Sequence, residues 1–271
     1  MVDRVAASGS RRASTVVFFA TVLGLSFGCG LPAALATIGA ISGPPDRFLP
    51  FLGIVVLSPT IAAVVASLYE GEGALRRLWS KLRPQRIKTW WYLVALGANS
   101  LIVAGACLLA NLLGEYHGRL FFPPTEPSRL VALVLLPIAE EVGWRGFALP
   151  RLLDRMSSTR ASVWLGIAWG AWHVPFLLVQ GVSWPLLLPL VLFFVPGSIV
   201  MTSLHERTRG SLLIAILFHM GAHVSNPHQL LPNDAAPAMI QLGGYLLVAF
   251  GIAGFSSASV SSKRRKTGRR R

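Results

Sequence analysis

The stretch LLPIAEEVGWRGFALP, residues 135–150, carries two adjacent carboxylates, Glu140 and Glu141, in the middle of an apolar run. The chain has 11 acidic residues, and all the others fall outside the apolar runs. A carboxylate at the centre of a membrane span costs a few kcal/mol at least, so acidic residues at that depth usually serve a function. We therefore expect a membrane-embedded fold that is built around this pair.

The composition of the chain excludes an ordinary soluble domain. Apolar residues make up 53% of the 271 residues and charged residues only 13%, against roughly a quarter charged in soluble domains. The apolar residues come in runs of about twenty, long enough to cross a hydrocarbon core about 30 Å thick. We predict an all-α, polytopic integral membrane protein with about eight transmembrane helices and a polar site at the bilayer midplane. The expected spans are residues 15–40, 48–69, 90–113, 129–150, 161–181, 184–204, 211–225 and 238–256.

The basic residues are distributed asymmetrically. The formal net charge is +14, and with a cytoplasmic N-terminus most of the 25 Lys and Arg residues lie on the inner side, as the positive-inside rule requires. We predict a multi-pass protein of the cell membrane with both termini cytoplasmic. A single membrane-embedded helical domain covers residues 1–256, with its motifs at 129–225, and a basic cytoplasmic tail covers 257–271. Because topology accounts for the charge, the lipid bilayer is an expected partner and nucleic acid is not.

Residues 72–88 form a sizeable loop between the second and third expected spans. Four large apolar residues in it follow helical spacing, and basic residues occupy the other side. These apolar residues are Leu75, Leu78, Trp79 and Leu82. The pattern fits an amphipathic helix on the inner leaflet, and a solvated connector is an equally good interpretation.

Arg145 lies four residues after Glu141, on the same face of a helix. This spacing favours an ion pair that offsets the cost of burying both charges. Glu140 points about 100° away from that pair. We therefore expect Glu141 and Arg145 to support the site, and Glu140 to remain a free carboxylate suited to act as a general base.

Three histidines lie at a similar depth to the acidic pair. Counted from the cytoplasmic ends of their spans, Glu140 and these histidines lie roughly 12 to 18 Å deep. They are His173, His219 and His223. One buried histidine is usually an ordinary core residue, but three at the depth of an acidic pair indicate a shared polar site. The remaining histidines, His117, His205 and His228, are expected in loops without a role in the site.

A carboxylate and an imidazole that converge in an apolar cavity can bind a water molecule, take its proton and pass it to a leaving amine. Imidazoles from a third helix can donate hydrogen bonds to the developing oxyanion. Together these steps hydrolyse a peptide bond without a covalent intermediate. No catalytic Cys–His pairing is visible in the sequence, which disfavours a cysteine nucleophile.

Three ordered motifs carry a family resemblance: EEVGWR (140–145), WGAWH (169–173) and FHMGAH (218–223). They fit EExxxR, FxxxH with a Trp as the aromatic residue, and a variant of HxxxN. This set resembles the CPBP family of intramembrane glutamic endopeptidases, which includes the type II CAAX prenyl proteases and the Abi-like bacteriocin-processing or immunity proteins. The resemblance covers residues 129–225, and the layout of spans extends it over most of the chain.

The resemblance implies a membrane-embedded protease domain that cleaves a membrane-tethered or prenylated substrate with a Glu/His-activated water. It implies a water-activating pair, Glu140 and His173, an oxyanion hole, His219 and His223, and a supporting pair, Glu141 and Arg145. No cofactor and no metal are expected. The expected partner is a membrane-associated peptide or protein, including a lipidated one.

The last motif position, usually Asn or Asp in the family, is His223 here. A neutral imidazole donates one hydrogen bond and can replace an amide. The same residue opens an alternative, because His173, His219 and His223 with Glu140 form a possible zinc-ligand set. A zinc enzyme of the HExxH type would have Glu directly after its first histidine, whereas Met220 follows His219.

A second alternative is a protein without protease activity. Midplane Glu and His residues together with interrupted helices also suit a proton-coupled transporter or a membrane immunity protein. The span at 184–204 is interrupted by prolines, but no corresponding segment forms a second, related half. The sequence therefore favours the protease and leaves the other classes open.

Overall fold

The computed structural model describes residues 2–114, 127–224, 239 and 242–252. Within them it contains helices and turns and no β-strand, which confirms the predicted all-α class. The elements are α1 (Val2–Thr37), η1 (Pro45–Arg47), α2 (Leu49–Glu70), α3 (Ala74–Ser80), α4 (Trp90–Leu112), α5 (Pro127–Glu141), η2 (Val142–Ala148), α6 (Leu149–Leu153), α7 (Ser158–Val179), α8 (Trp184–Arg207) and α9 (Leu212–Val224). A further helical segment covers residues 242–252.

Five helices in the described part of the chain are long and apolar enough to cross a membrane. They are Ser10–Thr37, Pro50–Glu70, Trp90–Leu112, Ser158–Val179 and Trp184–Arg207. The protein is therefore a multi-pass membrane protein, and these helices match five of the expected spans. The last two expected spans correspond to shorter helices, Leu212–His223 and Leu242–Ile252, so eight full spans are not established. The predicted tail at 257–271 lies outside the described residues.

The expected span at 129–150 is not one continuous α-helix. α5 ends at Glu141, and the chain continues as the π-helix η2, whose seven residues are all buried. A Cβ atom at Gly143 would collide with the backbone oxygen of Pro59 in α2, so glycine is what lets η2 and α2 approach this closely. Helical turns of the π type are rare and frequently lie at functional sites. This one begins directly after the two adjacent carboxylates.

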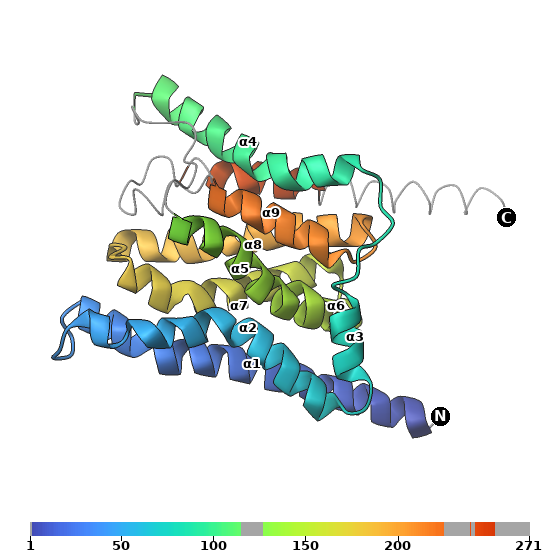
Figure 1. Cartoon of the computed structure of the whole chain (residues 1–271). Coiled ribbons are helices and arrows are strands. Elements are labelled where there is room, and N and C mark those ends of the chain that lie inside the picture. Colours follow the sequence, from blue (N-terminus) through green and yellow to red (C-terminus); the bar gives the residue numbers. More distant parts are fainter. Residues whose placement is uncertain (1, 115–126, 225–238, 240–241, 253–271) are drawn as a thin grey trace.

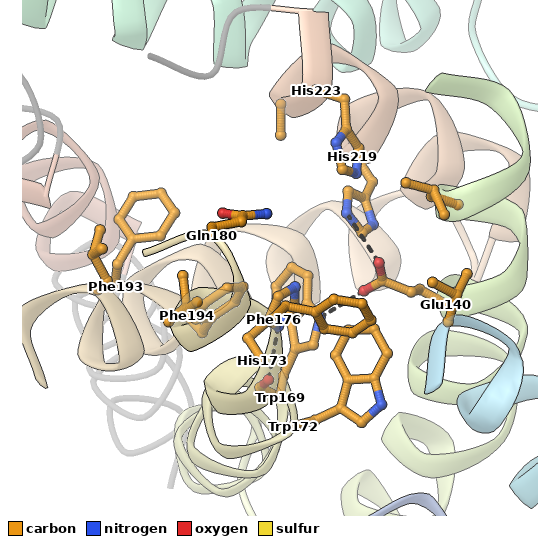
Figure 2. Close-up of a pocket in the computed structure, with 15 residues that line it drawn as sticks. Glu140, Trp169, Trp172, His173, Phe176, Gln180, Phe193, Phe194, His219 and His223 are labelled. Atoms are coloured by element: carbon orange, nitrogen blue, oxygen red, sulfur yellow. Dashed lines mark hydrogen bonds and ion pairs between the residues drawn. The ribbon is translucent and has the colours of Figure 1, made fainter. Parts of the chain in front are cut away.

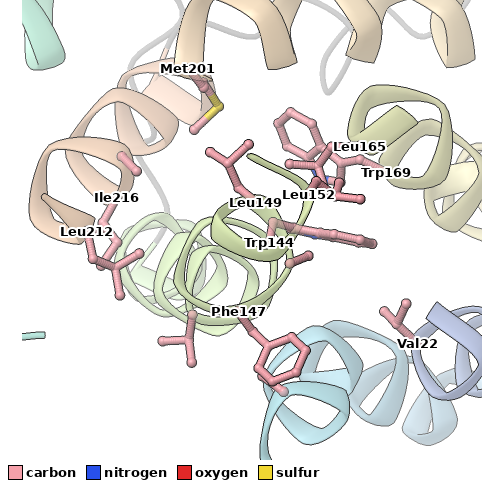
Figure 3. Packing of buried hydrophobic residues seen from close by; sticks show 14 of the residues in the cluster. Val22, Trp144, Phe147, Leu149, Leu152, Leu165, Trp169, Met201, Leu212 and Ile216 are labelled. Carbon is pink, nitrogen blue, oxygen red and sulfur yellow. The ribbon is translucent and has the colours of Figure 1, made fainter. Parts of the chain in front are cut away.

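The long helices lie side by side, with α4 and α9 on one side of the molecule and α1 and α2 on the other (Figure 1). α5 contacts both α2 and α9, so the acidic segment passes between the two sides. Aromatic rings fix η2 in this position: Phe18 of α1 packs edge-on against Trp144, at 5.6 Å between ring centroids, and stacks on Phe147 at 5.3 Å. Figure 3 shows Trp144 and Phe147 among the other buried apolar side chains around η2 and α6.

α7 and α8 pack with their backbones in close contact. A Cβ atom at Gly166 would lie 2.6 Å from Cα of Val195, and one at Gly170 would collide with the backbone oxygen of Val191. Glycines four residues apart let transmembrane helices approach in this way. The close contact brings aromatic residues of α8 next to the polar residues of α7.

Ion pairs join four elements at one end of the helix bundle. Glu70, at the end of α2, accepts hydrogen bonds from Arg77 of α3 at 3.2 Å and from Arg151 of α6 at 2.9 Å. Arg11 of α1 pairs with Asp154, just after α6, at 3.1 Å. These contacts hold the end of α2 next to the end of the acidic segment.

The segment at 72–88 has features of both an amphipathic helix and a connector. Its helix α3 is short, and it buries Ala74 and Leu78, while Trp79 and Leu82 are exposed. After α3, Lys81 donates a hydrogen bond from Nζ to the backbone oxygen of Gly146 in η2 at 2.7 Å. One face of this segment therefore packs on the protein, and its other face carries exposed apolar side chains.

His205 does not lie in a loop, as the sequence pattern predicted. α8 continues through it to Arg207, and the side chain is buried, 8% exposed. A turn over residues 208–210 follows the helix, and in it Gly210 has a positive φ of 78° and donates its N–H to the backbone oxygen of His205 at 2.7 Å. Glycine favours this left-handed conformation after a helix. His117 and His228 lie outside the described residues.

Candidate functional site

The four predicted site residues line one cavity of about 190 Å³ (Figure 2). Glu140 comes from α5, His173 from α7, and His219 and His223 from α9. The rest of the wall is largely aromatic and aliphatic, with Gln180 as a further polar residue. The polar site expected from the sequence is thus brought together in the fold.

Glu140 is held by a hydrogen bond and is not the free carboxylate that the spacing predicted. The indole Nε1 of Trp169 donates to its Oε2 at 2.8 Å, and the Glu140 side chain is almost fully buried. Its other oxygen, Oε1, faces Nε2 of His219 at 4.0 Å. One oxygen is therefore fixed, while the other is directed towards the histidines of α9.

His173 lies one helical turn after Trp169 and is fixed in orientation. Its Nδ1 lies 2.9 Å from the backbone oxygen of Trp169, which can only accept, so Nδ1 carries the hydrogen. The ring stacks on Phe194 of α8, with centroids 4.0 Å apart. Nε2 of the neutral ring is left as an acceptor, which is the form a base requires.

Glu141 and Arg145 form the buried ion pair that their spacing predicted. Arg145 donates from Nη1 to Oε1 of Glu141 at 2.8 Å, and both side chains are fully buried. The guanidinium also lies over the ring of Trp169, 4.3 Å from its centroid. Such stacking stabilises a buried cation and ties the ion pair to the residue that holds Glu140.

The sequence did not indicate that Glu141 also contacts His219. Nδ1 of His219 lies 2.8 Å from Oε1 of Glu141, so the carboxylate accepts its hydrogen. The residues are 78 positions apart, and no local pattern connects them. A neutral His219 therefore presents a lone pair at Nε2 towards Glu140, and it can donate to an oxyanion only when it is protonated.

Trp169 is the second feature that sequence reasoning missed. It was identified only as the aromatic residue of its motif, yet its indole N–H holds Glu140 and its backbone oxygen holds His173. A buried Trp usually finds a partner for its N–H, so a Trp at a position where the motif has Phe was the available signal.

The structure narrows the metal-ligand set considered above. Glu140, His219 and His223 each offer one ligand atom, and these atoms all lie within 4.8 Å of one another. His173 is not a member of this group. The remaining set is a carboxylate with two histidines from one helix.

Residues 126–225 match the family described as type II CAAX prenyl endopeptidase Rce1-like. The chain is also 31% identical over 148 residues to a protein of Methanococcus maripaludis named CAAX prenyl protease 2. The alignment covers 51% of this chain and 53% of that protein, so the chain spans about half the length of the curated relative it matches.

Proposed function

We propose that this chain, whose residues 126–225 match the family of type II CAAX prenyl endopeptidases, is an intramembrane endopeptidase in which Glu140 and His173 activate a water molecule. The observation that carries this proposal is the double role of Trp169, which holds both residues against one cavity. A base must be positioned before its strength matters. Trp169 positions both Glu140 and His173.

The proposed reaction needs no covalent intermediate. Water attacks the peptide carbonyl carbon while Glu140 takes its proton at Oε1, the oxygen that Trp169 does not hold. The proton then passes to the leaving nitrogen as the C–N bond breaks. Nε2 of His173 accepts the second hydrogen bond of the water and orients its oxygen for the attack.

The oxyanion is stabilised from α9 in this mechanism. His223 donates as a neutral ring, whereas His219 donates only as an imidazolium, because Glu141 already accepts its Nδ1 hydrogen. Arg145 and Glu141 hold this side of the cavity in place. Preorganised donors of this kind stabilise developing charge without rearrangement.

The proposed substrate is a membrane-associated peptide or protein whose scissile bond reaches the cavity. The aromatic and aliphatic lining suits an apolar segment next to that bond. The name of the relative, CAAX prenyl protease 2, makes prenylated C-termini the first substrates to assay.

The test compares purified wild type with Glu140→Gln in proteoliposomes that contain prenylated and unmodified membrane-tethered peptides. Glutamine keeps the shape of the side chain and cannot accept the proton, so we expect kcat/KM to fall at least about 100-fold. Glu72→Gln is the matched control, because Glu72 is exposed after α2 and away from the cavity. Full activity in Glu140→Gln would refute the assignment of the base.

A further inference from the structure

Glu140, His219 and His223 have the composition of a metal site. Two histidines four residues apart on one helix, with a carboxylate from another helix, make a His₂Glu set that leaves a fourth position open. Both histidines lie in α9, and their rings are stacked with centroids 5.0 Å apart and planes within 12° (Figure 2). Each of the two rings has a nitrogen within 4.8 Å of a carboxylate oxygen of Glu140.

His219 is already in the tautomer that a metal ligand needs. Glu141 accepts the hydrogen of Nδ1 at 2.8 Å, and Nε2 turns its lone pair towards Oε1 of Glu140 at 4.0 Å. A carboxylate behind a histidine is the arrangement that orients metal-ligating histidines and raises their basicity. Two acceptors that face each other at this distance favour an electropositive atom between them.

The separations fit an ion after a small closure. Ligand atoms around a tetrahedral zinc ion lie about 3.4 Å apart, given bond lengths of about 2.0 to 2.1 Å. The three ligand atoms lie within 4.8 Å of one another, so side-chain rotations that move them by about 1 Å bring them to bonding distance. Nitrogen and carboxylate donors suit Zn²⁺ among the common divalent ions.

We propose that Glu140, His219 and His223 bind a zinc-class divalent ion and that its binding switches off proteolysis. The binding site follows from the three side chains alone, whereas the inhibition rests on the proposed function. An ion on Oε1 of Glu140 occupies the lone pair that would take the proton from water. His223, which stands where the family motif has Asn or Asp, completes the set in this chain.

Binding is measured first, without any substrate. Protein in nanodiscs, stripped of metal, is titrated with Co²⁺, whose visible absorption reports tetrahedral coordination, and then with Zn²⁺ in competition. We expect one ion per chain in the wild type and at least about tenfold weaker binding in His223→Asn and in Glu140→Gln, because each loses a ligand. His205→Asn is the control, because that buried histidine lies outside the cavity.

Equal Co²⁺ binding in wild type, His223→Asn and Glu140→Gln would overturn the site. Inhibition is then measured on the wild type: Zn²⁺ should reduce cleavage at the concentrations at which it displaces Co²⁺, and a chelator should restore the rate. A rate that chelation abolishes and Zn²⁺ restores would overturn the inhibitory role. If the wild type cleaves nothing but binds Co²⁺ through these residues, the site stands and the proposed function fails.

Discussion

Trp169 joins the two residues that we propose as the water-activating pair. Its side chain holds one oxygen of Glu140, and its backbone holds the ring of His173 one turn along the same helix. The backbone contact follows from the helix, since residues four apart lie on one face. The side-chain contact depends on the indole N–H of Trp169, because a Phe at this position would carry no donor.

Trp169→Phe removes the hydrogen bond to Glu140 and keeps an aromatic ring next to Arg145 and Phe194. A hydrogen bond to a charged group contributes about 1.5 to 3 kcal/mol. We expect kcat to fall about tenfold or more with little change in KM, because the base loses its orientation and the substrate pocket does not. Steady-state kinetics in proteoliposomes measure this split.

Trp172→Phe is the matched comparison. It also removes a buried indole hydrogen bond, which Trp172 donates to Oγ of Ser58 at 2.8 Å, but Glu140 is not the acceptor. We expect it to lower thermal stability with a much smaller effect on kcat. Equal losses of kcat in the two variants would mean that Trp169 acts only as a packing residue.

At the scale of elements, the junction of α5 and η2 determines where the carboxylates point. The π-helix is held between α2, through Gly143, and the aromatic residues of α1. Thr60 of α2 also donates a hydrogen bond to the backbone oxygen of Ala139 at 2.6 Å. α2 therefore contacts the acidic segment on both sides of Glu140 and Glu141.

Gly143→Ala adds one methyl group where the backbone of Pro59 leaves no room. α2 and η2 have to separate, so we expect a loss of stability of about 1 to 3 kcal/mol, in the range of overpacked cores, together with a large loss of activity. Thermal denaturation in detergent and the cleavage assay measure the two effects. Gly105→Ala on α4, where the methyl group meets open space, should leave both nearly unchanged.

Lys81 connects the end of α3 to η2 through its hydrogen bond with Gly146. Burial, reinforced by the positive charge of Arg151, lowers the pKa of Lys81 from an ordinary 10.5 to about 8. Between these pH values the unfolded chain binds a proton that the folded chain has released, so the free energy of unfolding rises with pH there. Below about pH 8 Lys81 is protonated in both the folded and the unfolded chain, so this gain in the free energy of unfolding is absent there.

Lys81→Met should flatten the pH dependence of stability between about pH 8 and 10.5. Methionine keeps an unbranched apolar side chain and removes the titrating amine. Chemical denaturation in detergent at several pH values measures the slope in both proteins. If Lys81→Met keeps the slope of the wild type, a titrating group other than Lys81 causes that slope.

At the scale of the whole molecule, the distribution of charge predicts an orientation in the membrane. The ion pairs of Glu70 and Asp154 join the ends of α2, α3 and α6 to the start of α1, so this end of the bundle is rich in arginine. The N-terminus lies at the same end (Figure 1). From the positive-inside rule we predict that this end faces the cytoplasm.

Single cysteines test this orientation in intact cells. In a protein whose Cys29 and Cys107 are replaced by alanine, Ser42→Cys lies at the turn between α1 and α2, and Glu72→Cys lies at the opposite, arginine-rich end. We expect a membrane-impermeant maleimide to label Ser42→Cys directly and Glu72→Cys only after permeabilisation. The reverse pattern would invert the predicted topology.

The sequence by itself determined the all-α membrane class and most of the span positions, because long apolar runs leave the backbone no alternative to helices in a bilayer. It also predicted the Glu141–Arg145 pair, since residues four apart meet on one helix whatever surrounds them. The same local rule placed His219 and His223 on one face. These results needed no knowledge of how the helices pack.

Only the tertiary structure decided which partner each polar group takes. The contacts of Glu140 with Trp169 and of Glu141 with His219 join different helices, and helical periodicity says nothing about neighbours across a bundle. The π-helix and the extension of α8 through His205 likewise depend on packing against α2 and on the turn at Gly210. Local spacing fixes a face of a helix, whereas the choice of partner for that face is made by the whole packed chain.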